Sequence, residues 1–80
     1  MTQKTVTIYT TPTCHFCHMA KDFFEEKNVS FEEVDVSKSR EKAMEMIELS
    51  GQQGVPVISI GDAVIVGFDE EQIRQELNLK

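Results

Sequence analysis

The chain has 80 residues, a hydrophobic fraction of 40% and a charged fraction of 28%, values typical of one small globular domain. We therefore expect residues 1–80 to form a single domain with a small core, which excludes a two-domain enzyme and a deep substrate cavity. Fourteen acidic against eight basic residues leave a net charge of -6, which repels phosphate groups and predicts no binding to nucleic acid.

No apolar run approaches the roughly 20 residues that a membrane-spanning helix needs, so we expect no membrane association. The first five residues lead into a strand pattern without the apolar stretch of a secretory signal. A cytoplasmic monomer is the expectation that follows, although a secreted chain after removal of its signal would show the same pattern.

The first half of the chain predicts a strand, a helix and a second strand. Alternating apolar residues indicate a strand over residues 4–10, and a Thr-Pro-Thr segment ends it. Apolar residues at helical spacing indicate an amphipathic helix over residues 14–27, with both cysteines in its first turn. A second strand follows over residues 29–36, where we expect the acidic side chains to face solvent. The apolar positions used here are Val6, Ile8, Cys17, Ala20, Phe23, Phe24, Phe31, Val34 and Val36.

The second half predicts a helix, a hairpin and a last helix. Ser37 or Ser39 caps a helix that continues to residue 48 or 49, with Ala43, Met44 and Ile47 as its buried positions. Strands over residues 55–60 and 63–66 flank a Gly-Asp turn. In the last helix, Asp69 and Gln72 have the spacing of a capping box, and the apolar positions are Ile73, Leu77 and Leu79.

The element order is therefore β-α-β-α-β-β-α, which defines an α/β fold. A strand–helix–strand unit makes a right-handed parallel pair, and the later hairpin adds two antiparallel strands. We expect a mixed four-stranded sheet with three flanking helices and with the first strand in a central position. The end of that strand would deliver Cys14 to the edge of the sheet, where α/β folds usually place their chemistry.

Cys14 and Cys17 are too few for the disulfide framework of a secreted fold, and a bond between them would close a very small loop. A reactive role is therefore favoured over a structural one. Disulfides are attacked by thiolates, and the N-terminus of a helix stabilises an anion through its unpaired N–H groups. Cys14 at the helix start is thus the expected nucleophile, and Cys17, one turn further in, the resolving thiol.

Two alternatives remain for this pair. The cysteines could be buried structural thiols, because free cysteine is among the most buried residue types. They could also bind a metal, since Cys14, His15, Cys17 and His18 place four ligand-type side chains within five positions. A closed zinc site takes a second ligand pair from elsewhere, and this chain has no other Cys or His. The alternative function that remains is a metal or iron–sulfur carrier that uses the same cysteines.

Three motifs in order resemble the glutaredoxins and the related small redoxins that reduce ribonucleotide reductase. They are YTTPTCHFC at residues 9–17, GVPV at 54–57 and VGFD at 66–69, and together they span nearly the whole chain. The resemblance implies a thioredoxin fold and thiol–disulfide exchange. It also implies that Pro56 is cis and lies against the cysteines, and that Val55 offers its backbone to the bound substrate.

The resemblance implies disulfide-containing proteins as substrates, glutathione or thioredoxin reductase as reductant, and no tightly bound cofactor. It also leaves open a cluster shared between two subunits with glutathione as co-ligand. Many glutaredoxins have a lysine where this chain has Thr11, and Gly-Gly where it has Gly67-Phe68, and both departures favour a protein reductant over glutathione. Further candidates for substrate contact are Phe16, Gly67, Phe68 and Asp69.

His15 lies between the cysteines, where family members often have Pro-Tyr in place of His15-Phe16. A histidine can carry a positive charge near neutral pH. Its imidazolium would stabilise the Cys14 thiolate and make the protein more oxidising than its relatives.

Overall fold

The computed structural model describes residues 4–78 and contains seven elements in the order predicted from the sequence. Leu79, which we expected in the last helix, lies outside the described residues. The elements are β1 (Val6–Thr10), α1 (His15–Glu26), β2 (Glu32–Asp35), α2 (Arg40–Ser50), β3 (Val57–Ile60), β4 (Ala63–Val66) and α3 (Glu70–Leu77).

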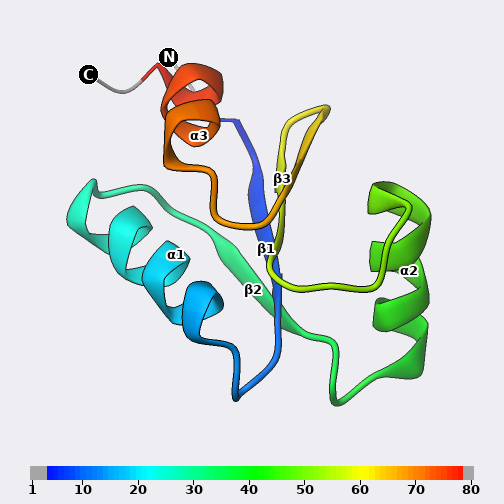
Figure 1. Ribbon diagram of the computed structural model, residues 1–80. Coiled ribbons are helices and arrows are strands. Elements are labelled where there is room, and N and C mark those ends of the chain that lie inside the picture. Colours follow the sequence, from blue (N-terminus) through cyan, green and yellow to red (C-terminus); the bar gives the residue numbers. More distant parts are fainter. Residues whose placement is uncertain (1–3, 79–80) are drawn as a thin grey trace.

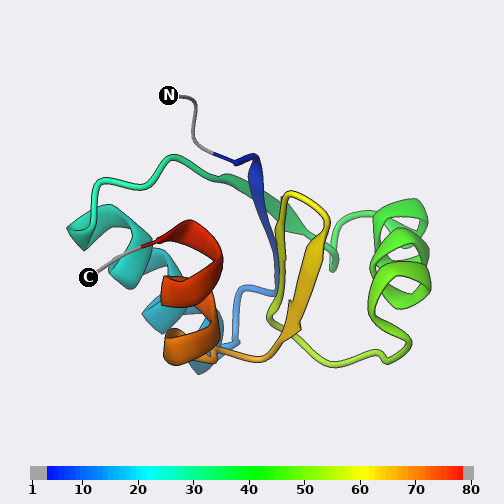
Figure 2. The ribbon, with the colours of Figure 1, turned by 90° about the horizontal axis from the view of Figure 1, so that it is seen from above.

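The four strands form one mixed sheet in the order β2-β1-β3-β4, so β1 is central, as predicted. It pairs in parallel with β2 and antiparallel with β3, and β4 pairs antiparallel with β3. Helices α1 and α3 cover one face of the sheet, and α2 lies on the other (Figures 1 and 2). None of the helices in residues 4–78 is long and apolar enough to cross a lipid bilayer.

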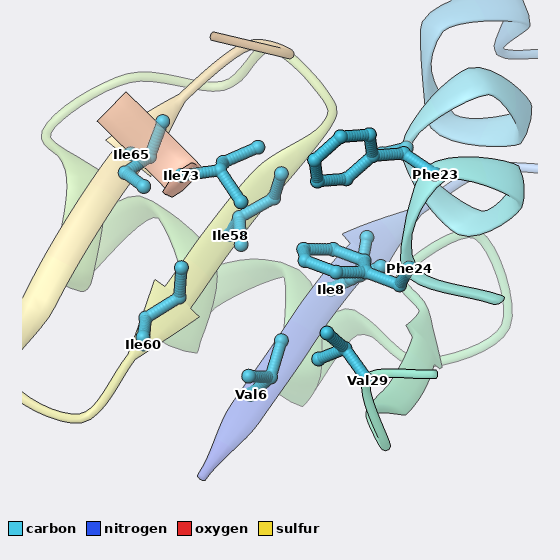
Figure 3. Packing of buried hydrophobic residues seen from close by; sticks show 10 residues of the cluster. Val6, Ile8, Phe23, Phe24, Val29, Ile58, Ile60, Ile65 and Ile73 are labelled. Atoms are coloured by element: carbon cyan, nitrogen blue, oxygen red, sulfur yellow. The ribbon is translucent and has the colours of Figure 1, made fainter. Parts of the chain in front are cut away.

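The larger part of the core lies between the sheet and the helices α1 and α3. Figure 3 shows Phe23 and Phe24 of α1 next to isoleucines of the central strands and of α3. Successive residues of a strand point to opposite faces, so Ile8 and Ile58 reach this side of the sheet while their chain neighbours face α2. Burial of a side chain of this size stabilises a fold by roughly 1.5–3 kcal/mol.

The smaller part of the core lies under α2 and corrects one expectation. Met46 is buried with Tyr9 and Val57, whereas Met44, which the pattern placed inside, is 56% exposed. The helical repeat of 3.6 residues per turn explains why Met46 and not Met44 is buried. Ala43 and Met46 share one face of the helix, whereas Met44 lies about 100° away from Ala43. The predicted helix is therefore confirmed and Ile47 packs against this core, but the prediction for Met44 is wrong because Met46 takes the buried position.

The helices begin at the expected capping residues. The side chains of Cys14, Ser39 and Asp69 each accept a hydrogen bond from the backbone three residues later. Ser39 therefore caps α2, whereas Ser37 bonds to Asp35 through its backbone N–H and its hydroxyl. These caps fix where each helix starts, including the helix that carries the cysteines.

Candidate functional site

The strand register brings the three sequence motifs to one edge of the sheet. Tyr9 pairs with Val57 in antiparallel orientation, so the chain leaving β1 and the chain entering β3 lie at the same edge. Val57 also pairs with Val66, and just beyond this pair the Gly67 N–H donates to the Pro56 carbonyl oxygen at 2.8 Å. Segments far apart in the chain therefore surround one place.

The two cysteines differ in position and exposure. Cys14 is the N-cap of α1 and is partly exposed, and its Sγ accepts a hydrogen bond from the Cys17 backbone N–H at 3.1 Å. Its own N–H donates to the Thr11 carbonyl oxygen at 3.3 Å, which closes the turn before the helix. Cys17 is fully buried, and both thiols are free. A sulfur anion at Cys14 would thus meet a backbone donor at the positive end of the helix.

Burial and the neighbouring Cys14 raise the pKa of the Cys17 thiol to about 12. Desolvation disfavours the thiolate, and the hydrogen bond with Cys14 keeps the proton on Cys17. A backbone hydrogen bond from Thr11 and the positive charge of Lys21 act in the opposite direction. At neutral pH Cys17 is therefore a protonated thiol close to Cys14.

The residues between the cysteines face outward. Phe16 is 57% exposed, and the His15 ring stands edge-on to it with the ring centroids 5.7 Å apart. His18 is also exposed, and its Nε2 lies 3.3 Å from the Pro12 carbonyl oxygen. Phe16 thus gives the site an apolar surface next to the cysteines.

The Val55–Pro56 peptide bond is cis, as the resemblance implied, and Pro56 is buried. Beside it, Gly67 has a positive φ of 84°, and a Cβ built there would meet no atom within 4 Å. The backbone of this loop therefore borders open space.

Phe68 and Asp69 also have structural roles. The Phe68 ring packs edge-on against the Phe23 ring at 5.8 Å, and the Asp69 carboxylate accepts the Gln72 N–H at 3.2 Å. The side chains of these two candidate residues are thus engaged in packing and in helix capping.

One group of polar residues was not expected from the sequence. Glu33, expected only to face solvent, accepts hydrogen bonds through a single oxygen from Lys21 Nζ at 3.0 Å and from Thr10 Oγ1 at 2.9 Å. The Lys21 and Thr10 hydrogen bonds hold the pKa of Glu33 below its usual value. Two features of the sequence point to this contact. Lys21 lies four residues after Cys17 and so on the same face of the helix. Glu33 lies two residues after Phe31, so in an extended chain its side chain is on the same side as that of Phe31, which packs toward α1.

The alternative function, a metal carrier, would need a group of metal-binding side chains. Within residues 4–78, no three His, Cys, Asp or Glu side chains are grouped so that they could hold a metal ion.

Comparison with known proteins gives consistent matches. A family model described as glutaredoxin matches residues 6–65, a range that includes both cysteines and Pro56. The glutaredoxin of Neisseria meningitidis serogroup A is 43% identical over 75 residues, which cover 91% of this chain and 88% of that protein.

Two solved structures extend the comparison. The glutaredoxin of Archaeoglobus fulgidus has a TM-score of 0.84 at 26% identity, over 96% of this chain and 88% of that one. The glutaredoxin-like protein NrdH-redoxin of Escherichia coli has a TM-score of 0.77 at 33% identity, over 88% of this chain and 91% of that one. With its thioredoxin fold and a thiol–disulfide redox role, the chain belongs to the glutaredoxin family.

Proposed function

We propose that the protein is a dithiol–disulfide oxidoreductase in which Cys14 attacks a substrate disulfide and Cys17 resolves the mixed disulfide. The observation that carries this proposal is the asymmetry of the pair. The Cys14 sulfur is partly exposed at the helix N-terminus and faces a backbone N–H at 3.1 Å, whereas the Cys17 sulfur is buried and protonated.

The reaction transfers two electrons to the substrate. The Cys14 thiolate bonds to one substrate sulfur, the substrate S–S bond breaks, and the departing thiolate takes up a proton. Cys17 then loses its proton and attacks Cys14 Sγ, which lies on the same helix face, so the second substrate sulfur leaves. The substrate is released as a dithiol, and the protein holds a Cys14–Cys17 disulfide.

The substrate segment is proposed to lie along the edge formed by Val55, Pro56 and Gly67. The open space at Gly67 supports this placement, and the exposed Phe16 ring supplies an apolar contact next to the reacting sulfur. Phe68 and Asp69 flank the same edge, where Asp69 adds negative charge to a chain whose net charge is -6. An open edge with an exposed apolar ring suits a disulfide-bonded protein, which we propose as the main substrate class. Mixed disulfides of glutathione are proposed as smaller substrates of the same reaction.

Thioredoxin reductase, and not glutathione, is the proposed reductant. The E. coli NrdH-redoxin structure is described as that of a glutaredoxin-like protein with a thioredoxin-like activity profile. This chain also has Thr11 where many glutaredoxins have a lysine, and Gly67-Phe68 where they have Gly-Gly. Both differences weaken the case for glutathione. The oxidised protein should be reduced faster by thioredoxin reductase with NADPH than by glutathione. Reduction by glutathione at an equal or higher rate would overturn this choice.

Single substitutions of the cysteines test the assigned roles. Cys17→Ser should attack a disulfide-bonded protein and remain joined to it through Cys14, whereas Cys14→Ser should form no such adduct. Non-reducing electrophoresis and mass spectrometry identify the adduct and the cysteine that holds it. Trapping of substrate by Cys14→Ser through Cys17 would reverse the roles.

A further inference from the structure

We propose that Lys21 is a positioning residue for the resolving step, held so that its positive charge favours loss of the proton from Cys17 in the mixed disulfide. The inference rests on the proposed function, because it takes Cys17 to be the resolving thiol. It adds a third side chain of α1 to the reaction.

The contacts of Lys21 hold its ammonium group against the sheet. Lys21 follows Cys17 by four residues and so lies on the same face of α1. Its Nζ is 3.0 Å from Glu33 Oε2, which also accepts the Thr10 hydroxyl at 2.9 Å. The Lys21 side chain is only 23% exposed, and Thr10 is 1% exposed. The cation is therefore fixed on the side of the helix where Cys17 is buried.

The charge matters most after substrate has bound to Cys14. In the dithiol, burial and the neighbouring Cys14 both keep the proton on Cys17. Once the Cys14 sulfur is part of a disulfide it carries no charge, so its effect on Cys17 disappears while the cost of burial remains. The Lys21 charge and the Thr11 backbone hydrogen bond are then the influences that favour the Cys17 thiolate.

Two carboxylates of β2 lie close to Lys21. Glu33 pairs with it directly, and Asp35 lies close enough for its pKa to be lowered by Lys21, after the larger effect of its hydrogen bond from Ser37. Among the described residues, Lys21 is the cation whose charge lowers the pKa of Cys17. Removing it should therefore slow the step that needs the Cys17 thiolate.

The chemical balance of the step is complete without another reactant. Cys17 releases its proton to solvent and its sulfur bonds to Cys14 Sγ. The bond between Cys14 Sγ and the substrate sulfur breaks, and its electron pair leaves on the substrate thiolate. Lys21 changes only how often Cys17 is deprotonated.

The experiment uses dithiobis(nitrobenzoate), an aromatic disulfide that releases one coloured thiolate when Cys14 attacks and a second when Cys17 resolves. Stopped-flow absorbance on the reduced protein separates the two releases over a range of pH. In Lys21→Gln, the second release should be roughly three- to tenfold slower below the pKa of Cys17, because a lower thiolate fraction is partly offset by higher nucleophilicity. Its pH profile should move to higher pH, while the first release keeps its rate.

Matched variants separate charge from structure. Lys21→Arg keeps the charge and should restore the second release, and Lys27→Gln, which removes a lysine just after the end of the same helix, should match the wild type. An unchanged second release in Lys21→Gln, or a slow one with the wild-type pH profile, would overturn the role of Lys21. A wild type that releases only one thiolate would instead overturn the assignment of Cys17 as resolving thiol.

Discussion

At the scale of single residues, the Tyr9–Glu45 pair links burial to proton binding. Burial and the 2.6 Å hydrogen bond to Glu45 raise the pKa of Tyr9 from 10.0 to about 12. Tyr9 is the only tyrosine and the chain has no tryptophan, so tyrosinate absorbance in an alkaline titration reports this residue alone. We expect its ionisation near pH 12 in the folded protein.

The same shift predicts how stability changes at high pH. The folded state favours the neutral phenol, so this contribution is fully present below pH 10 and is lost as the pH rises through about 12. Tyr9→Phe should lose less stability over that interval than the wild type in urea unfolding. A Tyr9 ionisation at the value of a free tyrosine would contradict the buried hydrogen bond.

His15 offers a test of electrostatic control over Cys14. His15 is the first residue of α1, a position where proline is well tolerated, so His15→Pro should fold normally. Loss of a side chain that can carry positive charge should destabilise the Cys14 thiolate and shift the reduction potential to a more negative value. Equilibration with a glutathione redox buffer measures the shift, and His18→Gln is the matched control. Equal potentials in His15→Pro and the wild type would remove His15 from the account.

Glu33 predicts a change of stability on the acid side. Its pKa is lowered by the Lys21 and Thr10 hydrogen bonds, so its contribution is present above the pKa of an ordinary glutamate and is lost as the pH falls through the lowered value. The Glu33 side chain is 39% exposed, so solvent screening limits the effect to about 1 kcal/mol or less. Urea unfolding should show a weaker acid dependence for Glu33→Gln than for the control Glu32→Gln. Equal acid dependence in the two variants would show that the ion pair does not contribute.

At the scale of elements, the buried face of α2 is the clearest test of the packing. Met46 is 2% exposed, so Met46→Ala should lower the free energy of unfolding by about 2–4 kcal/mol. Met44→Ala changes a side chain that is 56% exposed and should alter it by about 0.5 kcal/mol or less. Denaturant unfolding measures both. A larger loss in Met44→Ala than in Met46→Ala would show that Met44, as the sequence pattern predicted, faces the core.

The elements themselves were predictable because their signals are local. Apolar spacing gave the order of strands and helices, and Cys14, Ser39 and Asp69 marked the helix starts. The β2 strand starts later than predicted because the Val29 N–H donates to the Phe24 carbonyl oxygen at 2.8 Å, which keeps that residue with the end of α1. Element boundaries depend on such hydrogen bonds, which apolar spacing does not reveal.

The site was predictable only in part. The position of Cys14 at a helix start follows from the sequence, and with it the difference between the two thiols. The Lys21–Glu33 ion pair joins a helix to a strand, and only the packing of α1 on the sheet determines that they meet. Likewise, the Gly67–Pro56 hydrogen bond depends on how β4 pairs with β3. Contacts between elements therefore account for what the sequence did not show.

At the scale of the whole molecule, sheet order produces the site. A central β1 with antiparallel β3 at its side brings the helix start, the Val55–Pro56 loop and the Gly67 loop to one edge. Cys17 lies on the buried face of α1, whereas Cys14 at the N-cap of the same helix is partly exposed. The chemical difference between two thiols of the same short motif is thus a property of the fold.

Alkylation of the reduced protein at neutral pH tests that claim most directly. Brief treatment with iodoacetamide, followed by acid quenching and tandem mass spectrometry, locates the label on each cysteine. We predict labelling of Cys14 while Cys17 remains a free thiol, because burial and a pKa of about 12 leave Cys17 almost no thiolate. In urea, both cysteines should react at similar rates. Labelling of Cys17 first, or of both cysteines at equal rates in the folded protein, would contradict the account.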